Sequence, residues 1–107
     1  MLRALIESLS MLASDAAVQV AWLDEHGWPS DELAEDHSAP ARNAWWMCEE
    51  GLISAEVRDL VERIDMIFTE MSGAQNAARW TYAALTTDDG WSQIRAAARR
   101  ALGLLRS

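Results

Sequence analysis

Hydrophobic residues recur every three or four positions along most of the chain, the spacing that places side chains on one face of an α-helix. The first stripe keeps its phase for about six turns and consists of Leu2, Leu5, Ile6, Leu9, Leu12, Ala13, Ala16, Val20 and Leu23. Within it, Ser14-Asp15 is also a signal for the start of a second helix. We favour one continuous helix because the phase is unbroken, and we expect it to end at Gly27.

The stripe with the clearest boundaries follows Ser54, which we predict to be the N-cap of a helix that ends at Gly73. Its buried face is predicted to consist of Val57, Leu60, Val61, Ile64, Ile67, Phe68 and Met71. On the outer face, Asp59 and Arg63 are four residues apart, so we expect them to form an ion pair.

Shorter helices are predicted between these two stripes. We expect Ser30 to cap a short helix that Asp31 and Glu32 open, because negative charge suits the positive end of a helix. Pro40 either closes that helix or lies in the first turn of the next one, which covers about 41–50.

Two further helices are predicted after Gly73. The first covers about 74–85 and buries Ala77, Trp80 and Ala84. Thr87 is expected to cap the second, with Asp88 and Asp89 in its first turn. Its predicted buried face consists of Trp91, Ile94, Ala98, Ala101, Leu102 and Leu105.

The composition supports an all-α fold. The 107 residues include two prolines and five glycines, whereas alanine, leucine, glutamate and arginine, all good helix formers, are abundant. The connections are short, and no linker or repeat separates the segments. We therefore expect one domain, residues 1–107, built as a compact bundle of about five helices.

Several classes of protein are excluded by the sequence. The single cysteine, Cys48, cannot form an internal disulfide, and we expect it to be a small buried hydrophobe. No apolar run approaches the roughly 20 residues that span a bilayer, and the N-terminus lacks the pattern of a signal peptide. The expectation is a cytoplasmic protein with no membrane partner.

No motif indicates catalysis. Glycine-rich phosphate-binding patterns, GxSxG and HExxH are all absent, so we expect no catalytic residue, no metal and no cofactor. His26 and His37 each follow a pair of carboxylates, which is compatible with a weak metal or acid–base site. We expect both histidines instead at solvated helix ends, where acids and histidines are common.

Charge is distributed unevenly. Residues 1–36 carry eight acids against one arginine (net −7), residues 37–70 seven against three (net −4), and residues 71–107 two against five (net +3). Six of the acids form a run without any basic residue: Asp24, Glu25, Asp31, Glu32, Glu35 and Asp36. Such a run either keeps a small protein soluble or steers a basic partner into contact. Nucleic acid is not expected as a direct partner, and the arginines after Trp91 are expected to pair with the acidic part and with the helix dipole.

Tryptophan is the second unusual feature, with six in the chain. Trp80 and Trp91 fall on predicted buried faces. Trp28 lies in a turn within the acidic run, so it is our candidate for the aromatic anchor of an interface. The adjacent Trp45 and Trp46 cannot point the same way. We therefore expect one of the two to join Trp28 in the candidate site, and we assign Trp46 to it.

The chain resembles small uncharacterised helical proteins of GC-rich bacteria. The resemblance is carried by Ser14-Asp15 through Trp22-Leu23, by Met71-Ser72-Gly73 with Asn76-Ala77 and Trp80-Thr81, and by Trp91, Ile94-Arg95 and Ala98. Such proteins are similar in size and acidity to the immunity proteins encoded beside polymorphic toxins. The resemblance implies a binding function and attaches no activity to any residue.

We therefore expect a protein-binding module and not an enzyme. The leading hypothesis is an immunity or antitoxin-type inhibitor of a basic, nuclease-like toxin domain. Its partner-binding residues would be Asp24, Glu25, Trp28, Asp31, Glu32, Glu35, Asp36 and Trp46. Two alternatives remain: a homodimeric structural or adaptor protein without inhibitory role, and a small enzyme or metal protein that uses His26 and His37.

Overall fold

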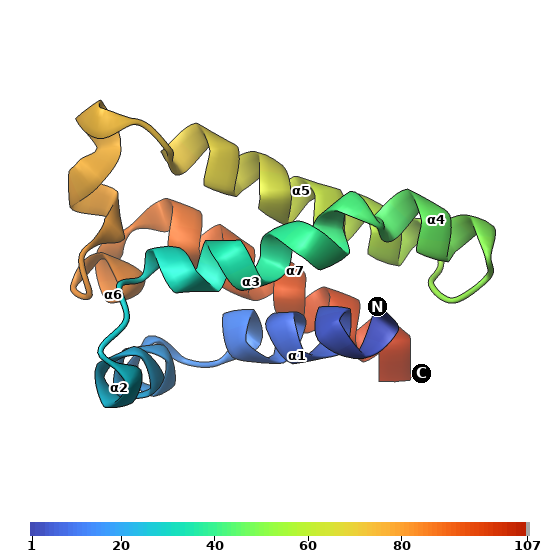
Figure 1. Cartoon of the computed structure of the whole chain (residues 1–107), viewed down its shortest axis with the longest axis horizontal. Coiled ribbons are helices and arrows are strands. Elements are labelled where there is room, and N and C mark those ends of the chain that lie inside the picture. The colour runs from blue at the N-terminus through green and yellow to red at the C-terminus, as the bar shows by residue number, and fades with distance from the viewer. Residues whose placement is uncertain (107) are drawn as a thin grey trace.

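The computed structural model describes residues 1–106, and helices account for 82% of them, with no strand (Figure 1). In chain order the elements are α1 (Leu2–Ala13), α2 (Ala16–His26), α3 (Asp31–Arg42), α4 (Ala44–Glu49), α5 (Ala55–Met71), the 3₁₀ helix η1 (Ala74–Trp80), α6 (Ala84–Thr87) and α7 (Asp89–Arg106). The all-α prediction is confirmed. The prediction of about five helices is wrong, because the described residues form eight helical segments.

Four long helices enclose the core. α7 packs against α1 and α5, and α3 packs against the same two helices, so that α1, α3, α5 and α7 form a closed ring (Figure 1). The buried hydrophobic residues form one cluster inside this ring. The predicted faces of α5 and α7 are confirmed, with only Leu60 and Leu105 partly exposed.

α1 and α2 are separate helices bent by 114°, so the prediction of one continuous helix is wrong. Ser14 is extended at the corner. The backbone carbonyls at the end of α1, which have no partner within the helix, accept hydrogen bonds from side chains. Arg99 of α7 donates to Ala13 O (2.8 Å), Arg95 of α7 donates to Ser14 O (3.0 Å), and Gln19 donates to the last carbonyls of α1. The corner is therefore stabilised by two arginines far away in sequence and by the nearby Gln19 of α2.

Among residues 1–106, no single helix is long and apolar enough to cross a membrane, and α1 and α2 pass that test only together, as the bent pair.

Helix boundaries follow the predictions in part. Ser54 Oγ accepts the Val57 N–H (3.2 Å), which confirms this N-cap. Pro40 lies inside α3, in its last turn, and neither closes it nor opens α4. The Ser30 side chain does not cap α3, because its hydroxyl donates to Trp80 O (2.5 Å) instead.

The segment predicted as one helix at about 74–85 divides into η1 and α6, which leaves Ala77 exposed. Thr87 belongs to α6 and does not cap α7. Asp88 takes that role, since its Oδ1 accepts the Gly90 N–H (2.7 Å) while both oxygens accept from Arg79. The predicted pair of Asp59 with Arg63 is also wrong, because Asp59 pairs with its neighbour Arg58 (3.0 Å).

An aromatic cluster closes one end of the core. Trp91 is buried and meets Phe68 and Trp80 edge-on, at centroid distances of 5.4 and 5.5 Å. Both indoles have their N–H satisfied: Trp80 donates to Met71 O (2.8 Å) and Trp91 to Arg79 O (2.9 Å). The core role predicted for both tryptophans is confirmed, although Trp80 is only half-buried.

Candidate functional site: an acidic ridge on helix α3

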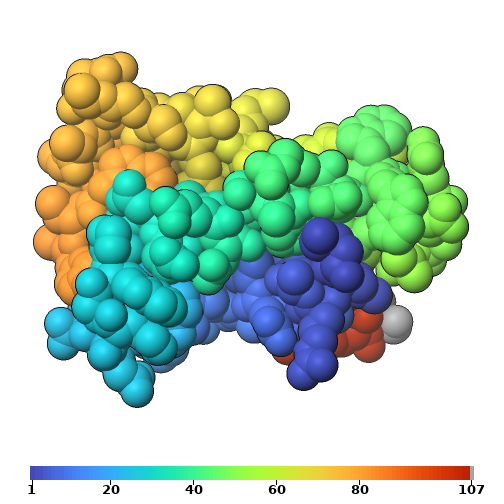
Figure 2. Space-filling model, viewed as in Figure 1, coloured from blue at the N-terminus to red at the C-terminus, as the bar shows by residue number. Residues whose placement is uncertain are grey.

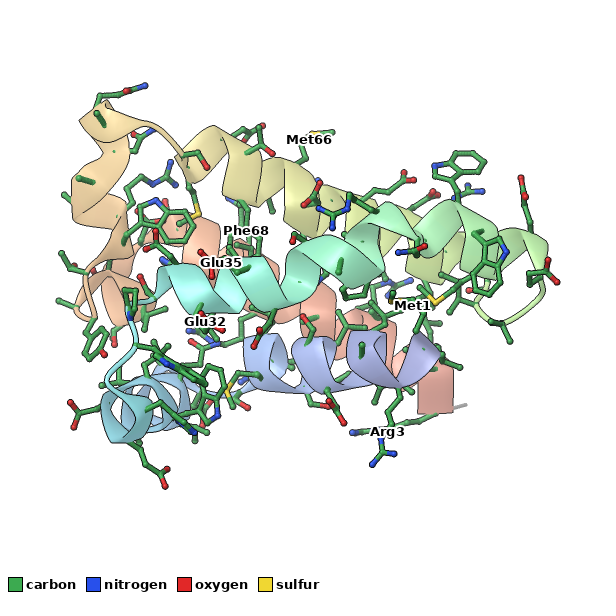
Figure 3. All side chains as sticks on the ribbon, viewed as in Figure 1. Met1, Arg3, Glu32, Glu35, Met66 and Phe68 are labelled. Atoms are coloured by element: carbon green, nitrogen blue, oxygen red, sulfur yellow. The ribbon has the colours of Figure 1, made fainter. Side chains whose placement is uncertain are left out.

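Four carboxylates form two rows along the exposed side of α3. Asp31 and Glu35 are one turn apart, as are Glu32 and Asp36, so the two pairs lie side by side on the helix surface. In Figure 3, Glu35 lies on the side of α3 towards α5 and Glu32 on the side towards α1 and α2. We call Asp31, Glu32, Glu35 and Asp36 the acidic ridge.

No ion pair in the described part of the chain involves the acidic ridge. The five pairs present join Arg3–Glu7, Arg58–Asp59, Arg79–Asp88, Arg99–Asp15 and Arg100–Glu56. The predicted pairing of the C-terminal arginines with the acidic part is thus confirmed for Arg99 and Arg100. It uses other acids and leaves the ridge uncompensated.

Asp24 and Glu25 are exposed in the last turn of α2 and have no ion pair either. A negative charge at this end of a helix opposes the helix dipole. All six acids of the run identified in the sequence are therefore exposed or half-buried and unpaired within residues 1–106.

The ridge is crowded enough to perturb its own titration. Burial raises the pKa of the half-buried Glu32 carboxyl, and the charges and hydrogen bonds of Asp36 and Glu35 raise it further. The folded protein therefore binds a proton at Glu32 more readily than the unfolded chain does. It follows that ionised Glu32 opposes folding at neutral pH, and that this cost disappears as pH falls and the carboxyl is protonated.

Replacing Glu32 by glutamine should accordingly raise the melting temperature at pH 7. The gain should shrink with added salt, which screens the repulsion, and vanish at pH 3, where the wild-type carboxyl is neutral. Thermal denaturation followed by circular dichroism at both pH values measures this. A lowered melting temperature at pH 7, or an equal gain at pH 3, would contradict the charge crowding.

Helix α3, which carries the ridge, crosses the middle of the face seen in Figure 2. A groove lies on each side of the ridge. The α1–α3 groove, of about 390 Å³, is lined by Ala4, Glu7, Ser8, Met11, Trp22, Leu33 and Asp36. The α3–η1 groove, of about 490 Å³, is lined by Asp31, Ala34, Glu35, Ser72, Gly73, Ala77 and Trp80. Each groove is therefore lined by a tryptophan and by at least one ridge carboxylate.

Trp28 lies at the edge of this surface but is not free. Its ring stacks on His26 (4.3 Å between centroids) and meets Trp22 edge-on (5.3 Å), and its carbonyl accepts a hydrogen bond from Tyr82 (2.6 Å). The side chain remains 37% exposed, so it can still bury surface against a partner. His26 is exposed, as predicted.

Trp46 is not brought to the ridge. It lies on α4, at the opposite end of the long axis from α2 (Figure 1), where 51% of it is exposed. Trp45 is 57% exposed, with the Arg58 guanidinium 4.2 Å from the centroid of its ring. A single site containing both Trp28 and Trp46, as predicted from the sequence, is therefore not formed. Cys48, beside them, is partly exposed and contacts Arg58 through its sulfur.

His37 lies in the core, so its predicted place at a solvated helix end is wrong. Its Nε2 lies 3.3 Å from Val61 O, which can only accept, and therefore carries the proton. Burial lowers the pKa of His37, and the ring is neutral, so Nδ1 accepts from Ser8 Oγ at 3.2 Å. The sequence signal for this was position: His37 falls one turn from the buried Leu33.

The Ser8–His37 pair has the composition of a nucleophile and base but not the surroundings. Ser8 lies inside α1, where the backbone N–H groups are engaged in the helix, and His37 is oriented by a neutral carbonyl instead of a carboxylate. The pair joins α1, α3 and α5 through the core. We assign it a structural role.

The carboxylates of the acidic ridge can attract the basic side chains of a partner, but they are not grouped to bind a metal ion. Within residues 1–106, no group of three or more histidine, cysteine or acidic side chains is placed to hold a metal. No protein-family model, curated protein or solved structure matches the chain.

Proposed function

We propose that this protein is a binding module whose acidic ridge docks on a basic protein, in the manner of an immunity or antitoxin-type inhibitor. The observation that carries the proposal is the uncompensated charge of the ridge, whereas arginines elsewhere are paired with other acids. Burial and, to a smaller extent, the neighbouring carboxylates raise the pKa of Glu32, and a partner's cations would offset the repulsion between these carboxylates. A basic nuclease-like domain offers such cations in its substrate-binding surface.

The ridge also has the anatomy of an interface. Charged groups lie on a helix, the grooves beside them have partly apolar and aromatic walls, and the partly exposed Trp28 lies nearby. In this proposal the carboxylates act on the encounter and Trp28 acts on the lifetime of the complex. No catalytic group or cofactor takes part.

The test needs a basic protein that binds this chain, and products of adjacent genes are the first to screen for one. Association and dissociation kinetics are then measured by stopped flow at several salt concentrations. Neutralising Asp31, Glu32, Glu35 and Asp36 to Asn or Gln should slow association about tenfold or more at low salt and flatten its salt dependence. Trp28→Ala should instead raise the dissociation rate constant, by a factor of about 30 for a loss of 2 kcal/mol.

The matched control neutralises Glu49, Glu50, Asp65 and Glu70. These four acids lie off the ridge and have no ion pair among the described residues, so neutralising them breaks none. The net charge changes by the same amount as in the ridge variant, because each variant loses four carboxylates. The control should retain most of the wild-type association rate. Equal kinetics for the ridge variant and this control would reduce the ridge to a solubilising surface.

A second candidate, self-association, is favoured by one observation. Trp45, Trp46 and Leu52 are 57%, 51% and 43% exposed at the end of the molecule that carries α4. If this end forms a homodimer, sedimentation should show a dimer that Trp46→Ala dissociates and that salt does not weaken. A monomer at high protein concentration would remove this candidate.

A further inference from the structure

The α1–α3 groove has an unusual set of polar groups. Glu7 and Asp36 face it from different helices, and Ser8 lies in its wall, 6% exposed. Because Ser8 gives its proton to His37, its oxygen offers only lone pairs to the groove. The three polar, non-aromatic side chains that line the groove therefore present hydrogen-bond acceptors alone.

The remaining lining is apolar and aromatic. Leu33 and Met11 provide aliphatic surface, and Trp22 is held edge-on by the ring of Trp28. Such a wall suits a hydrocarbon stem or a flat cation stacked on the indole. The two carboxylates are available: Asp36 has no ion pair, and Glu7 has only a solvent-exposed pair with Arg3 at 3.4 Å, which is weak.

We propose that this groove receives one arginine side chain of the basic partner, an inference that rests on the function proposed above. The guanidinium has five donors and no acceptor, which matches a groove that offers acceptors. It also stacks on indole and binds carboxylates from two sides, which a lysine ammonium does less well. The aliphatic stem covers Leu33 and Met11.

The α3–η1 groove is the natural comparison. Its carboxylates, Asp31 and Glu35, come from one helix, and the Trp80 indole N–H is committed to Met71 O. It shares the acidity of the ridge but has no carboxylate from a second helix. An effect confined to the α1–α3 groove therefore separates a specific contact from general charge.

N-Butylguanidinium is a suitable probe because it reproduces the arginine side chain, and N-butylurea has nearly the same shape without the charge. The Trp22 indole N–H signal in a ¹H–¹⁵N correlation spectrum should shift and saturate with millimolar butylguanidinium and not with butylurea. Asp36→Asn should weaken the probe about tenfold or more, as expected for loss of a charged hydrogen bond. Glu35→Gln, the same charge change on the other groove, should weaken it less than about twofold.

The inference is overturned if the Trp22 signal does not move, if butylurea moves it equally, or if both variants weaken the probe alike. It is also overturned if saturation with the bound partner leaves butylguanidinium binding intact, since the partner's arginine would then lie elsewhere. These outcomes are distinct from failure of the proposed function. If the ridge variant slows partner association but butylguanidinium never binds, the proposed function stands and the arginine pocket does not.

Discussion

Replacing Trp91 by alanine is expected to lower the free energy of unfolding by about 3–5 kcal/mol. The side chain is 1% exposed and lies where α7 begins, in contact with the rings of Phe68 and Trp80. Its loss leaves a cavity between α5, η1 and α7. It also removes the indole N–H that donates to the backbone carbonyl of Arg79. The side chain of Arg79 in turn donates to Asp88, the N-cap of α7. Because small domains are stable by only about 5–15 kcal/mol, the variant should be close to unfolding.

The control is another tryptophan of the same chain. Trp45 is 57% exposed and contacts the Arg58 guanidinium, so Trp45→Ala should cost less than about 1 kcal/mol. Urea denaturation followed by far-ultraviolet circular dichroism compares the two variants. Similar losses for both would show that the Phe68–Trp80–Trp91 cluster is not the packed end of the core.

The sequence predicted the long helices well where a single face decides the structure. Helix α5 has hydrophobic residues at helical spacing, Ser54 as its N-cap and a glycine beyond its end, and all three are local signals. α7 was equally predictable, because its apolar residues alternate with arginines at helical spacing. Periodicity is sufficient there, since the buried face does not depend on which helix covers it.

Other elements are decided by contacts distant in sequence, and these could not be predicted. The corner between α1 and α2 depends on Arg95 and Arg99, more than 75 residues away. Ser30 does not form its expected N-cap and instead donates to the carbonyl of Trp80, 50 residues further on. Sequence analysis pairs each polar side chain with a backbone group close to it in sequence, whereas the folded chain brings other hydrogen-bond partners near it.

The candidate site was predictable in its charge and not in its shape. A run of acids without a basic residue is visible in the sequence, and four of its six members lie on the exposed side of α3. The partners of the arginines, the two grooves and the distance of Trp46 from the ridge follow only from the packing of helices. The position of His37 inside the core was hidden for the same reason: its neighbours in sequence are acids that point the other way.

Replacing His37 by alanine should lower the free energy of unfolding by about 2–4 kcal/mol at pH 7.5. The ring is fully buried, and its removal leaves a cavity among α1, α3 and α5 and strips partners from Ser8 and Val61. His37→Leu keeps most of the volume and should cost less. Its cost should fall further when Ser8→Ala is added, because the hydroxyl is then no longer buried without a partner.

His37→Leu should also change how the free energy of unfolding depends on pH. Burial holds the pKa of His37 below 6.5, against the opposing effects of Val61 O and the Asp65 charge. The unfolded chain therefore binds a proton that the folded protein refuses, so wild-type stability is complete above pH 6.5 and falls as pH decreases towards the folded pKa. The slope is at most about 1.4 kcal/mol per pH unit. Urea denaturation between pH 7.5 and 5 should show this slope in wild type and in His26→Ala, since His26 is exposed, and should show it removed in His37→Leu. A slope that survives in His37→Leu would place the acid-sensitive group elsewhere and contradict a neutral histidine joining α1, α3 and α5.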